Sequence, residues 1–298
     1  MNPIREQTEY ILTKGFFVLL RCCPAPVICG LCQLVASIFY GLGRSRRKIT
    51  LQNLELVFSE KAPQERTKIA RAAYRHFGRM IAESAMVLAG KINRDKLVSM
   101  VDSTEMQTLL DLEKNTETGI LAITGHLGNF ELLSHYTGTQ SVRQSYVVAR
   151  QGNNRLIDDR IVTPMRESFG NRVIYKKRAL PQVARALRNG EHVGLLIDIK
   201  SGPAQGVPVT FFGKETYAIS SSAYLQIKLG VPVVPITMVR TAPSRYKLVV
   251  GKPIVWNDNG KPVEEQIAEL TQLHQTALEK LIRAYPEQWL WMHNRWRK

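Results

Sequence analysis

The chain has 298 residues and a formal net charge of +16, from 41 Lys and Arg against 25 Asp and Glu. This length can bury one large core, in one α/β domain or in two smaller domains. The positive charge favours an anionic partner such as nucleic acid, an anionic membrane or an acidic protein. All four cysteines lie between Cys22 and Cys32 without a nearby His or second CxxC pair, which argues against a zinc site.

The first predicted element is a membrane anchor. Residues 22–43, CCPAPVICGLCQLVASIFYGLG, contain no charged residue and match the roughly 20 residues that span a bilayer. A basic cluster follows at once, with Arg44, Arg46, Arg47 and Lys48. Because basic residues prefer the cytoplasmic side, we expect the C-terminal bulk to lie on the cytoplasmic side of the membrane. The run lacks a small-residue cleavage site at its end, so it predicts an uncleaved anchor over residues 1–48 that either spans the bilayer or lies in one leaflet.

The rest of the chain, residues 49–298, predicts a single α/β domain. Residues 49–90 follow a helical pattern, with a second helix starting near Ser59, and no strand signal occurs before about residue 119. Short β-branched runs then alternate with helical stretches. Strands are expected in GILAIT, QSYVVAR, NRVIY, HVGLLIDI, VPVVPITMV and YKLVVGKPIVW, and helices in NNRLIDDRIVTPMRESFG, LPQVARALRNG, SSSAYLQIKLG and finally Val263 to Ala284. This alternation predicts a largely parallel or mixed central sheet with helices on both faces.

The stretch TGHLGNFE, Thr124 to Glu131, stands at the end of the GILAIT strand. There His126 would lie at the carboxyl edge of the sheet, where open α/β sheets bind ligands, and Asn129 would cap the next helix. A His held by a carboxylate at one ring nitrogen can act as a general base through the other, which gives Glu131 an orienting role. Gly128 and the amides at the helix start would let a substrate approach and hold an oxyanion. The alternative is a hydrogen-bonded core histidine beside an ordinary N-terminal helix acid.

The stretch from Gly125 to Glu131 resembles the His-x4-Asp/Glu block of glycerolipid-type acyltransferases, in the form found in the lipid A biosynthesis late acyltransferases. Further similarity runs in order along nearly the whole chain. It includes Arg47 to Leu54, Arg150, Asn154 to Gly170 with Arg166, Phe211-Phe212-Gly213, Gly230 to Pro235, Arg240 and Trp291 to Trp296. One departure is the segment Asp198-Ile199-Lys200, where the family typically carries Asp-Gln.

The resemblance implies a glycerolipid-acyltransferase-like fold and direct transfer of a fatty acyl chain from an acyl carrier protein thioester to a hydroxyl of a phosphorylated glycolipid, a lipid A precursor. His126 would be the base and Glu131 its orienting acid. Arg150 and Arg166 would hold phosphates or the oxyanion, although an exposed helix charge is the competing interpretation for Arg166. Asp198 would orient polar substrate groups or simply end a strand.

Three other residues of the resemblance complete the expected site. Phe211 and Phe212, followed by Gly213, would line the acyl pocket or belong to the core. No metal cluster or dinucleotide loop is visible in the sequence, so no metal or cofactor is expected.

The distribution of charge agrees with two anionic partners. Between Ser141 and Asn189 there are eleven Lys and Arg against three Asp and Glu, which suits an acidic carrier protein and an anionic inner membrane. Three rival interpretations stay open: transfer to another polar lipid such as a glycerolipid, glycolipid or amino-acid lipid, a thioesterase, and a membrane-tethered nucleic-acid binder. The last has no recognisable nucleic-acid-binding motif in its favour, so no nucleic acid is expected as a partner.

Overall fold

The structure, a computed structural model, describes residues 3–296. Residues 1–2 and 297–298, at the ends of the two predicted domain ranges, lie outside the described residues. The helices are α1 (Pro3–Cys22), α2 (Ala25–Leu42), α3 (Arg44–Val57), α4 (Pro63–Leu88), α5 (Arg94–Met100), α6 (Met106–Lys114), α7 (Phe130–Gln140), α8 (Arg155–Ile157), α9 (Thr163–Glu167), α10 (Ala179–Arg188), α11 (Ser221–Leu229) and α12 (Val263–Ala284). The strands are β1 (Val101–Asp102), β2 (Leu121–Thr124), β3 (Ser145–Ala149), β4 (Asn171–Tyr175), β5 (His192–Leu196), β6 (Gly206–Phe211), β7 (Lys214–Ile219), β8 (Val233–Ala242) and β9 (Arg245–Val250). A short π-helical turn, Asp158–Val162, joins α8 to α9, and a 3-10 turn, Pro286–Gln288, follows α12.

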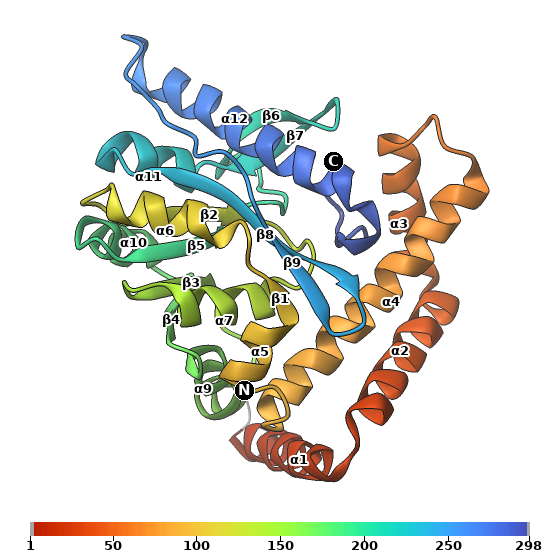
Figure 1. The fold of residues 1–298 in the computed structure, drawn as a ribbon. Helices are drawn as coiled ribbons and strands as arrows, with labels where there is room; N and C mark the ends of the chain where they lie inside the picture. The colour runs from red at the N-terminus through yellow and green to blue at the C-terminus, as the bar shows by residue number, and fades with distance from the viewer. Residues whose placement is uncertain (1–2, 297–298) are drawn as a thin grey trace.

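Within residues 3–296, seven strands form the central sheet in the order β1-β9-β8-β2-β5-β3-β4 (Figure 1). The pairs formed by β2, β3, β4, β5 and β8 are parallel, as is β1 with β9, whereas β8 and β9 form an antiparallel hairpin. The prediction of a mostly parallel α/β sheet flanked by helices is therefore confirmed.

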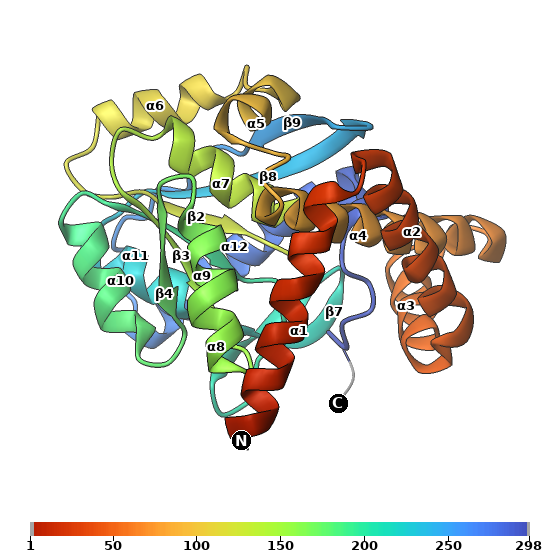
Figure 2. The same ribbon diagram turned by 90° about the horizontal axis from the view of Figure 1, so that it is seen from below.

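Helices cover both faces of this sheet. Helices α5, α6, α7 and α9 lie on one face, and α10, α11 and α12 lie on the other (Figures 1 and 2). The central strands carry apolar side chains to both layers: Val233 belongs to the core cluster on one face and its neighbour Val234 to the cluster on the other. Strands that are buried on both faces are nearly continuous apolar runs, which is why the sequence signal for β8 is strong.

Three short strands were not predicted. A separate antiparallel hairpin, β6–β7, covers residues 206–219, and the two-residue strand β1 lies before residue 119, where no strand was expected. The β6–β7 turn consists of Phe212 and Gly213, both with positive φ, as in the two-residue turns that suit β-hairpins. Pro208 within β6 weakens the strand signal of that segment.

The N-terminal region is helical throughout its described length. The expected apolar run forms α2, which has an 18-residue window of mean hydropathy 1.8, so by length and composition it could cross a membrane. Helix α1 precedes it and was not predicted. Helix α3 runs through the predicted boundary at residues 48 and 49 without a break. The next helix, α4, begins at Pro63 and not near Ser59, and the Glu65 carboxylate accepts a hydrogen bond from the Ala62 amide at its start.

Candidate active site

The turn between β2 and α7 carries His126 at the carboxyl edge of the sheet. Asn129 caps α7, because its Oδ1 accepts a hydrogen bond of 3.0 Å from the Leu132 amide. Gly128 has a φ of 61°, and a Cβ at this position would lie 2.0 Å from the Met238 carbonyl oxygen of β8. Only glycine fits here, since it adopts the left-handed conformation and permits this close approach of two backbones. The local sequence therefore fixes where the histidine leaves the strand.

His126 is held by Asp198. Strand β5 lies parallel to β2 with Leu196 opposite Thr124, so the residues two positions further along, His126 and Asp198, emerge side by side. The Asp198 Oδ1 atom lies 2.9 Å from His126 Nδ1, and its Oδ2 accepts the His126 backbone N–H at 2.7 Å. Because a carboxylate only accepts, Nδ1 carries the proton and Nε2 is the basic nitrogen.

Asp198 is buried and fully engaged. Its side chain is 2% exposed, and its Oδ2 also accepts the indole N–H of Trp289 at 2.8 Å. Burial alone would raise the pKa of this carboxyl, but His126 and these hydrogen bonds outweigh burial and lower the pKa to about 2. Gly125 makes room for the carboxylate, since a Cβ there would lie 2.9 Å from Oδ2. Asp198 is therefore an anion at all physiological pH values.

The electrostatic surroundings favour a basic His126. Burial lowers the pKa of the imidazole, but the charge of Asp198, its hydrogen bond and the more distant charge of Glu131 together raise the pKa above its ordinary value. The side chain is 23% exposed, and within residues 3–296 no hydrogen bond to Nε2 is found. The ring packs edge to face against Phe130, with 5.0 Å between the ring centroids. This arrangement leaves Nε2 accessible to a substrate hydroxyl.

The hydrogen bond expected between His126 and Glu131 is not formed, because the ring is bound to Asp198 instead. The Glu131 carboxylate instead binds the guanidinium of Arg166 on α9 with two hydrogen bonds, of 3.1 Å to Nε and 2.6 Å to Nη2. A planar guanidinium matches both carboxylate oxygens, so it is the stronger partner for this acid. Asp198 therefore takes the orienting position, and Glu131 acts on His126 through space. Arg166 is a partly buried ion-pair partner and not a freely exposed helix charge.

Most of the backbone amides of this turn already have acceptors. The Gly128 N–H donates to the Gln288 carbonyl at 3.0 Å, and the Asn129 N–H donates to the Met238 carbonyl at 2.8 Å. The amides of His126 and Leu132 are bound as described above. These four amides, of His126, Gly128, Asn129 and Leu132, hold the turn in place and are therefore not oxyanion donors. That the remaining amides at the start of α7 hold an oxyanion stays a prediction.

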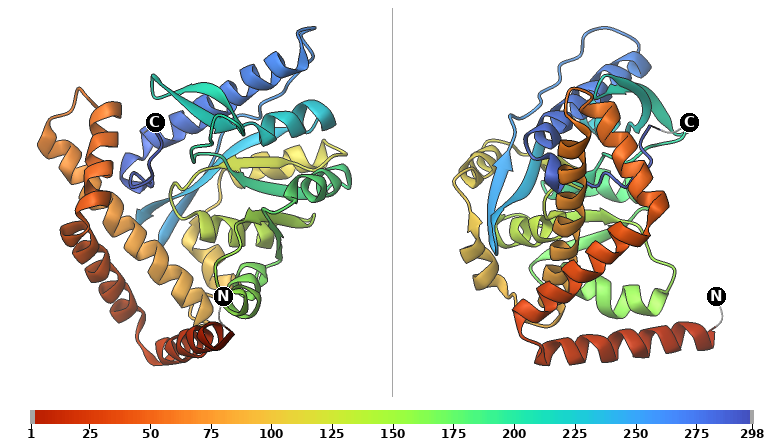
Figure 3. Two further views of the ribbon diagram at one scale, coloured as in Figure 1. Left: turned by 180° about the vertical axis from the view of Figure 1, so that it is seen from behind. Right: turned by 90° about the vertical axis from the view of Figure 1, so that its right-hand side faces the viewer.

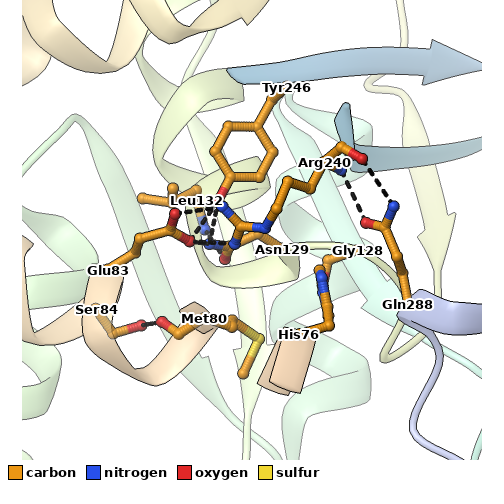
Figure 4. A network of polar contacts seen from close by, with 10 residues as sticks. All are labelled: His76, Met80, Glu83, Ser84, Gly128, Asn129, Leu132, Arg240, Tyr246 and Gln288. Carbon is orange, nitrogen blue, oxygen red and sulfur yellow. Dashed lines mark hydrogen bonds and ion pairs between the residues drawn. The ribbon is translucent and has the colours of Figure 1, made fainter. Parts of the chain in front are cut away.

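A buried polar network supports the turn from behind, as Figure 4 shows. Arg240 of β8 binds Glu83 of α4 through two hydrogen bonds of 2.5 and 2.6 Å, and Tyr246 of β9 donates to the same carboxylate. The side-chain amide of Asn129 donates to Glu83 at 2.7 Å, so the helix cap is itself held in place. His76 is 3.0 Å from the Gly128 carbonyl through Nε2, and burial lowers its pKa to about 4, so it is a neutral donor. The turn that carries His126 is thus fixed from α4, β8 and β9.

The remaining predicted residues lie at different depths. Arg150 follows β3 at the same carboxyl edge as His126 and is exposed. Phe211 and Phe212 are 0% and 4% exposed and pack against each other and against Trp289. The structure gives these two rings a place in the core, and Gly213 belongs to the hairpin turn. Their role in lining an acyl pocket stays a prediction.

The C-terminal tail contributes residues that the sequence did not single out for the site. Trp289 holds Asp198, and Arg295, which is fully buried, donates to the carbonyls of Ile199 and Tyr217 at 2.7 and 3.0 Å. It thereby fixes the segment that follows Asp198. One feature of the sequence could have indicated that Asp198 holds His126: each residue follows a strand, and the two strands were expected to be parallel. The prediction did not include the strand order, which places these two strands next to each other.

Comparison with known proteins places this chain in a family. The chain matches the sequence model described as "Bacterial lipid A biosynthesis acyltransferase" over residues 3–298. It is 26% identical over 277 residues to the lipid A biosynthesis palmitoleoyltransferase of Escherichia coli K12 and 26% identical over 284 residues to the lauroyltransferase of the same strain, in each case over 92% of this chain and 86% of the relative. A lipid A biosynthesis acyltransferase of Haemophilus influenzae is 24% identical over 93% of this chain and 86% of its own length. The chain is thus an acyltransferase and belongs to the bacterial lipid A biosynthesis acyltransferase family.

Proposed function

We propose that this protein transfers a fatty acyl chain from an acyl carrier protein thioester to a hydroxyl of a lipid A precursor at the cytoplasmic face of the inner membrane. One observation carries the proposal: His126 stands at the carboxyl edge of the sheet with Nδ1 held by buried Asp198 and Nε2 accessible. This is the arrangement that prepares an imidazole to remove a proton from a hydroxyl.

His126 acts as the general base for direct transfer. Nε2 takes the proton from the acceptor hydroxyl, and the oxygen attacks the thioester carbonyl carbon to give a tetrahedral oxyanion. When this collapses, the carbon–sulfur bond breaks and the imidazolium returns the proton to the sulfur. The products are the new ester and the carrier thiol. Asp198 holds the required tautomer and stabilises the imidazolium, so no serine or cysteine nucleophile is needed.

Basic side chains at the same edge support an acidic carrier protein as donor. We define the basic surface as Arg150, Lys176, Lys177 and Arg178, all of which are exposed. Arg150 follows β3 and the other three follow β4; β3 pairs with β5, and β4 pairs with β3 at the edge of the sheet. Because the carboxyl ends of parallel strands meet at one edge, the basic surface lies on the side of the sheet that carries His126. A positive surface of this kind attracts an acidic protein and orients it.

Arg166 is our choice for the group that holds an acceptor phosphate or the oxyanion. Glu131 engages its Nε and Nη2, which fixes the guanidinium plane and leaves Nη1 as a donor. Arg150 serves as a second, more exposed anion contact. The role of Glu131 is then to orient Arg166 and to strengthen the base through its charge.

The test is an assay of the purified full-length protein with acyl carrier protein thioesters and a panel of acceptor lipids, read by mass spectrometry. We expect an acyl chain to be added to a lipid A precursor, and the His126→Ala variant to lose transfer while keeping its fold. Acylation of a different polar lipid would change the acceptor, and free fatty acid as the sole product would indicate a thioesterase. Turnover of His126→Ala near that of the wild type would refute the mechanism.

A further inference from the structure

Helices α1 and α2 expose a large apolar surface. On α2 the side chains of Val27, Leu31, Leu34, Val35, Ile38 and Leu42 are 46% to 79% exposed, and their spacing puts them on one side of the helix. On α1, Leu12, Phe16 and Leu19 are 56% to 68% exposed. Exposed apolar surface on this scale marks an interface with a membrane or with another protein.

The opposite side of α2 is packed against α4 along its length. Ile28, near the start of α2, is 1% exposed. In the middle, Gly78 of α4 allows close contact, since a Cβ there would lie 2.8 Å from the Cys32 carbonyl oxygen. Near the end, the rings of Tyr40 and Tyr74 are 5.1 Å apart. Figure 3 shows α2 beside α4 in both views, so α2 is part of the folded domain and not a separate stalk.

Helix α1 is also fixed to the domain, through its N-terminal half. Asn154, the buried N-cap of α8, donates through its side chain to the Glu6 carbonyl and to the Glu9 carboxylate, each at 3.0 Å. The Arg160 guanidinium lies 5.5 Å from the centroid of the Tyr10 ring. Figure 2 shows α1 next to α8 on one side and turning into α2 on the other. The two helices therefore form a connected pair that is attached to the same domain at both ends.

These attachments conflict with a membrane-crossing α2. If α2 crossed the bilayer, α1 would be on the far side, away from Asn154. The exposed Arg71 and Arg75 of α4 would also follow α2 into the hydrocarbon, where charged side chains are costly. Both conflicts disappear if the two helices lie flat, with their apolar sides in the lipid and α4 above them.

The charge of this region identifies the surface it fits. Residues 10 to 54 contain no Asp or Glu, but they include Lys14, Arg21, Arg44 and Lys48, which are exposed. Basic residues beside an apolar helix face bind anionic headgroups. We propose that α1 and α2 form a monotopic membrane-contact surface that lies in one leaflet of an anionic bilayer and does not cross it. This inference is independent of which lipid accepts the acyl chain.

Topology gives the first test. In the full chain with its four cysteines replaced by serine, a single cysteine is placed at Gln7 on α1 or at Lys280 on α12, both exposed. A membrane-impermeant maleimide is then added to inverted inner-membrane vesicles and to spheroplasts. We expect both thiols to react in inverted vesicles and neither in spheroplasts. If Gln7→Cys reacts in spheroplasts, or reacts in neither preparation until detergent is added, the proposal is overturned.

Vesicle binding gives the second test. The purified full chain is floated with vesicles of phosphatidylcholine alone or with added phosphatidylglycerol, and binding is expected to require phosphatidylglycerol. The double variant Leu31→Ser/Leu34→Ser should bind at least about tenfold more weakly, as should Arg21→Glu/Arg44→Glu. Val98→Ser/Leu180→Ser, two apolar residues exposed elsewhere, should bind as the wild type does. Circular dichroism confirms that each variant is folded. A Leu31/Leu34 variant that loses self-association but keeps vesicle binding would instead assign this surface to a second copy of the chain.

Discussion

At the scale of single residues, the site depends on which acid holds His126. The imidazole is bound by Asp198 of the neighbouring strand, whereas the acid within its own sequence block, Glu131, is paired with Arg166. The two acids therefore do different work: one holds the ring directly, and the other acts through an arginine and through its charge.

Replacing Asp198 by Asn should change the pH profile as well as the rate. Asp198 raises the pKa of His126 against the opposing effect of burial. In the proposed mechanism, His126 acts as a base only when its ring is neutral. Wild-type activity should therefore rise as pH increases through this raised pKa. In Asp198→Asn the anion is gone and burial remains, so the pKa should fall and the acid limb of kcat/KM should move to lower pH. The maximal rate should fall by about 10²- to 10⁴-fold, because the tautomer is no longer enforced.

Glu131→Gln is the matched variant for this experiment. The acid limb of its kcat/KM profile should also move to lower pH, but by less than in Asp198→Asn. The reason is that the Glu131 charge makes the smallest of the contributions to the pKa of His126. Its main effect should be a higher KM for the acceptor, because Arg166 loses its bidentate partner. If Asp198→Asn slowed turnover without moving the acid limb, its role would be structural.

A stability prediction concerns Gly128. Gly128→Ala places a side chain at a φ of 61° and 2.0 Å from the Met238 carbonyl oxygen, so we expect a loss of unfolding free energy of about 2 kcal/mol or more. Gly213→Ala is the control: its φ is 71°, but no atom lies within 4 Å of the added Cβ, so the cost should be about 1 kcal/mol. Denaturant titration compares the two. If both variants lost the same unfolding free energy, the close contact between Gly128 and the Met238 carbonyl of β8 would not constrain the turn.

At the scale of elements, α4 links the sheet to the N-terminal helices. Its Glu83 joins Arg240 of β8, Tyr246 of β9 and the cap of α7 in one buried network. Arg240, Tyr246 and Asn129 all bind the same Glu83 carboxylate. Helix α4 therefore helps to set the position of the turn that carries His126.

Breaking this ion pair should destabilise the protein strongly. Glu83→Gln leaves the Arg240 guanidinium buried and unpaired, so the free energy of unfolding should fall by about 3–5 kcal/mol. The double variant Glu83→Gln/Arg240→Met removes the stranded charge and should recover part of this loss. Thermal or denaturant unfolding of the four proteins of the cycle measures the coupling. Simple additivity of the two changes would contradict a coupled pair.

The helices and strands also show which parts of the fold could be predicted from the sequence. The β-branched runs and the helix from Val263 to Ala284 were found, since their patterns are local and strong. The hairpin β6–β7 was missed because Pro208 and the Phe-Gly turn interrupt its strand pattern. His126 was located by its own turn residues. Its true partner is 72 positions away and becomes a neighbour only through the order of the strands, which local patterns do not encode.

At the scale of the whole molecule, the basic surface and the exposed apolar side chains of α1 and α2 belong to different parts of the chain. The basic surface lies at the carboxyl edge of the sheet beyond β3 and β4, and the exposed apolar side chains belong to α1 and α2. In the proposed reaction, the acidic carrier protein and the lipid acceptor therefore approach from different directions.

This separation predicts a selective effect of charge reversal. Lys176→Glu/Lys177→Glu should lower kcat/KM for acyl carrier protein thioesters by about tenfold or more, because steering by the basic surface is lost. Transfer from a small pantetheine thioester, which lacks the acidic protein, should be unchanged. Lys252→Glu/Lys280→Glu alters net charge equally at other exposed sites and should have little effect. An equal loss with both donors would rule out a carrier-binding role.

The contact between Trp289 and Asp198 also has a consequence for biosynthesis. The indole that holds this acid is synthesised 91 residues after Asp198, and well after α1 and α2. We therefore expect the arrangement of His126 and Asp198 to be completed only once the C-terminal tail has been made.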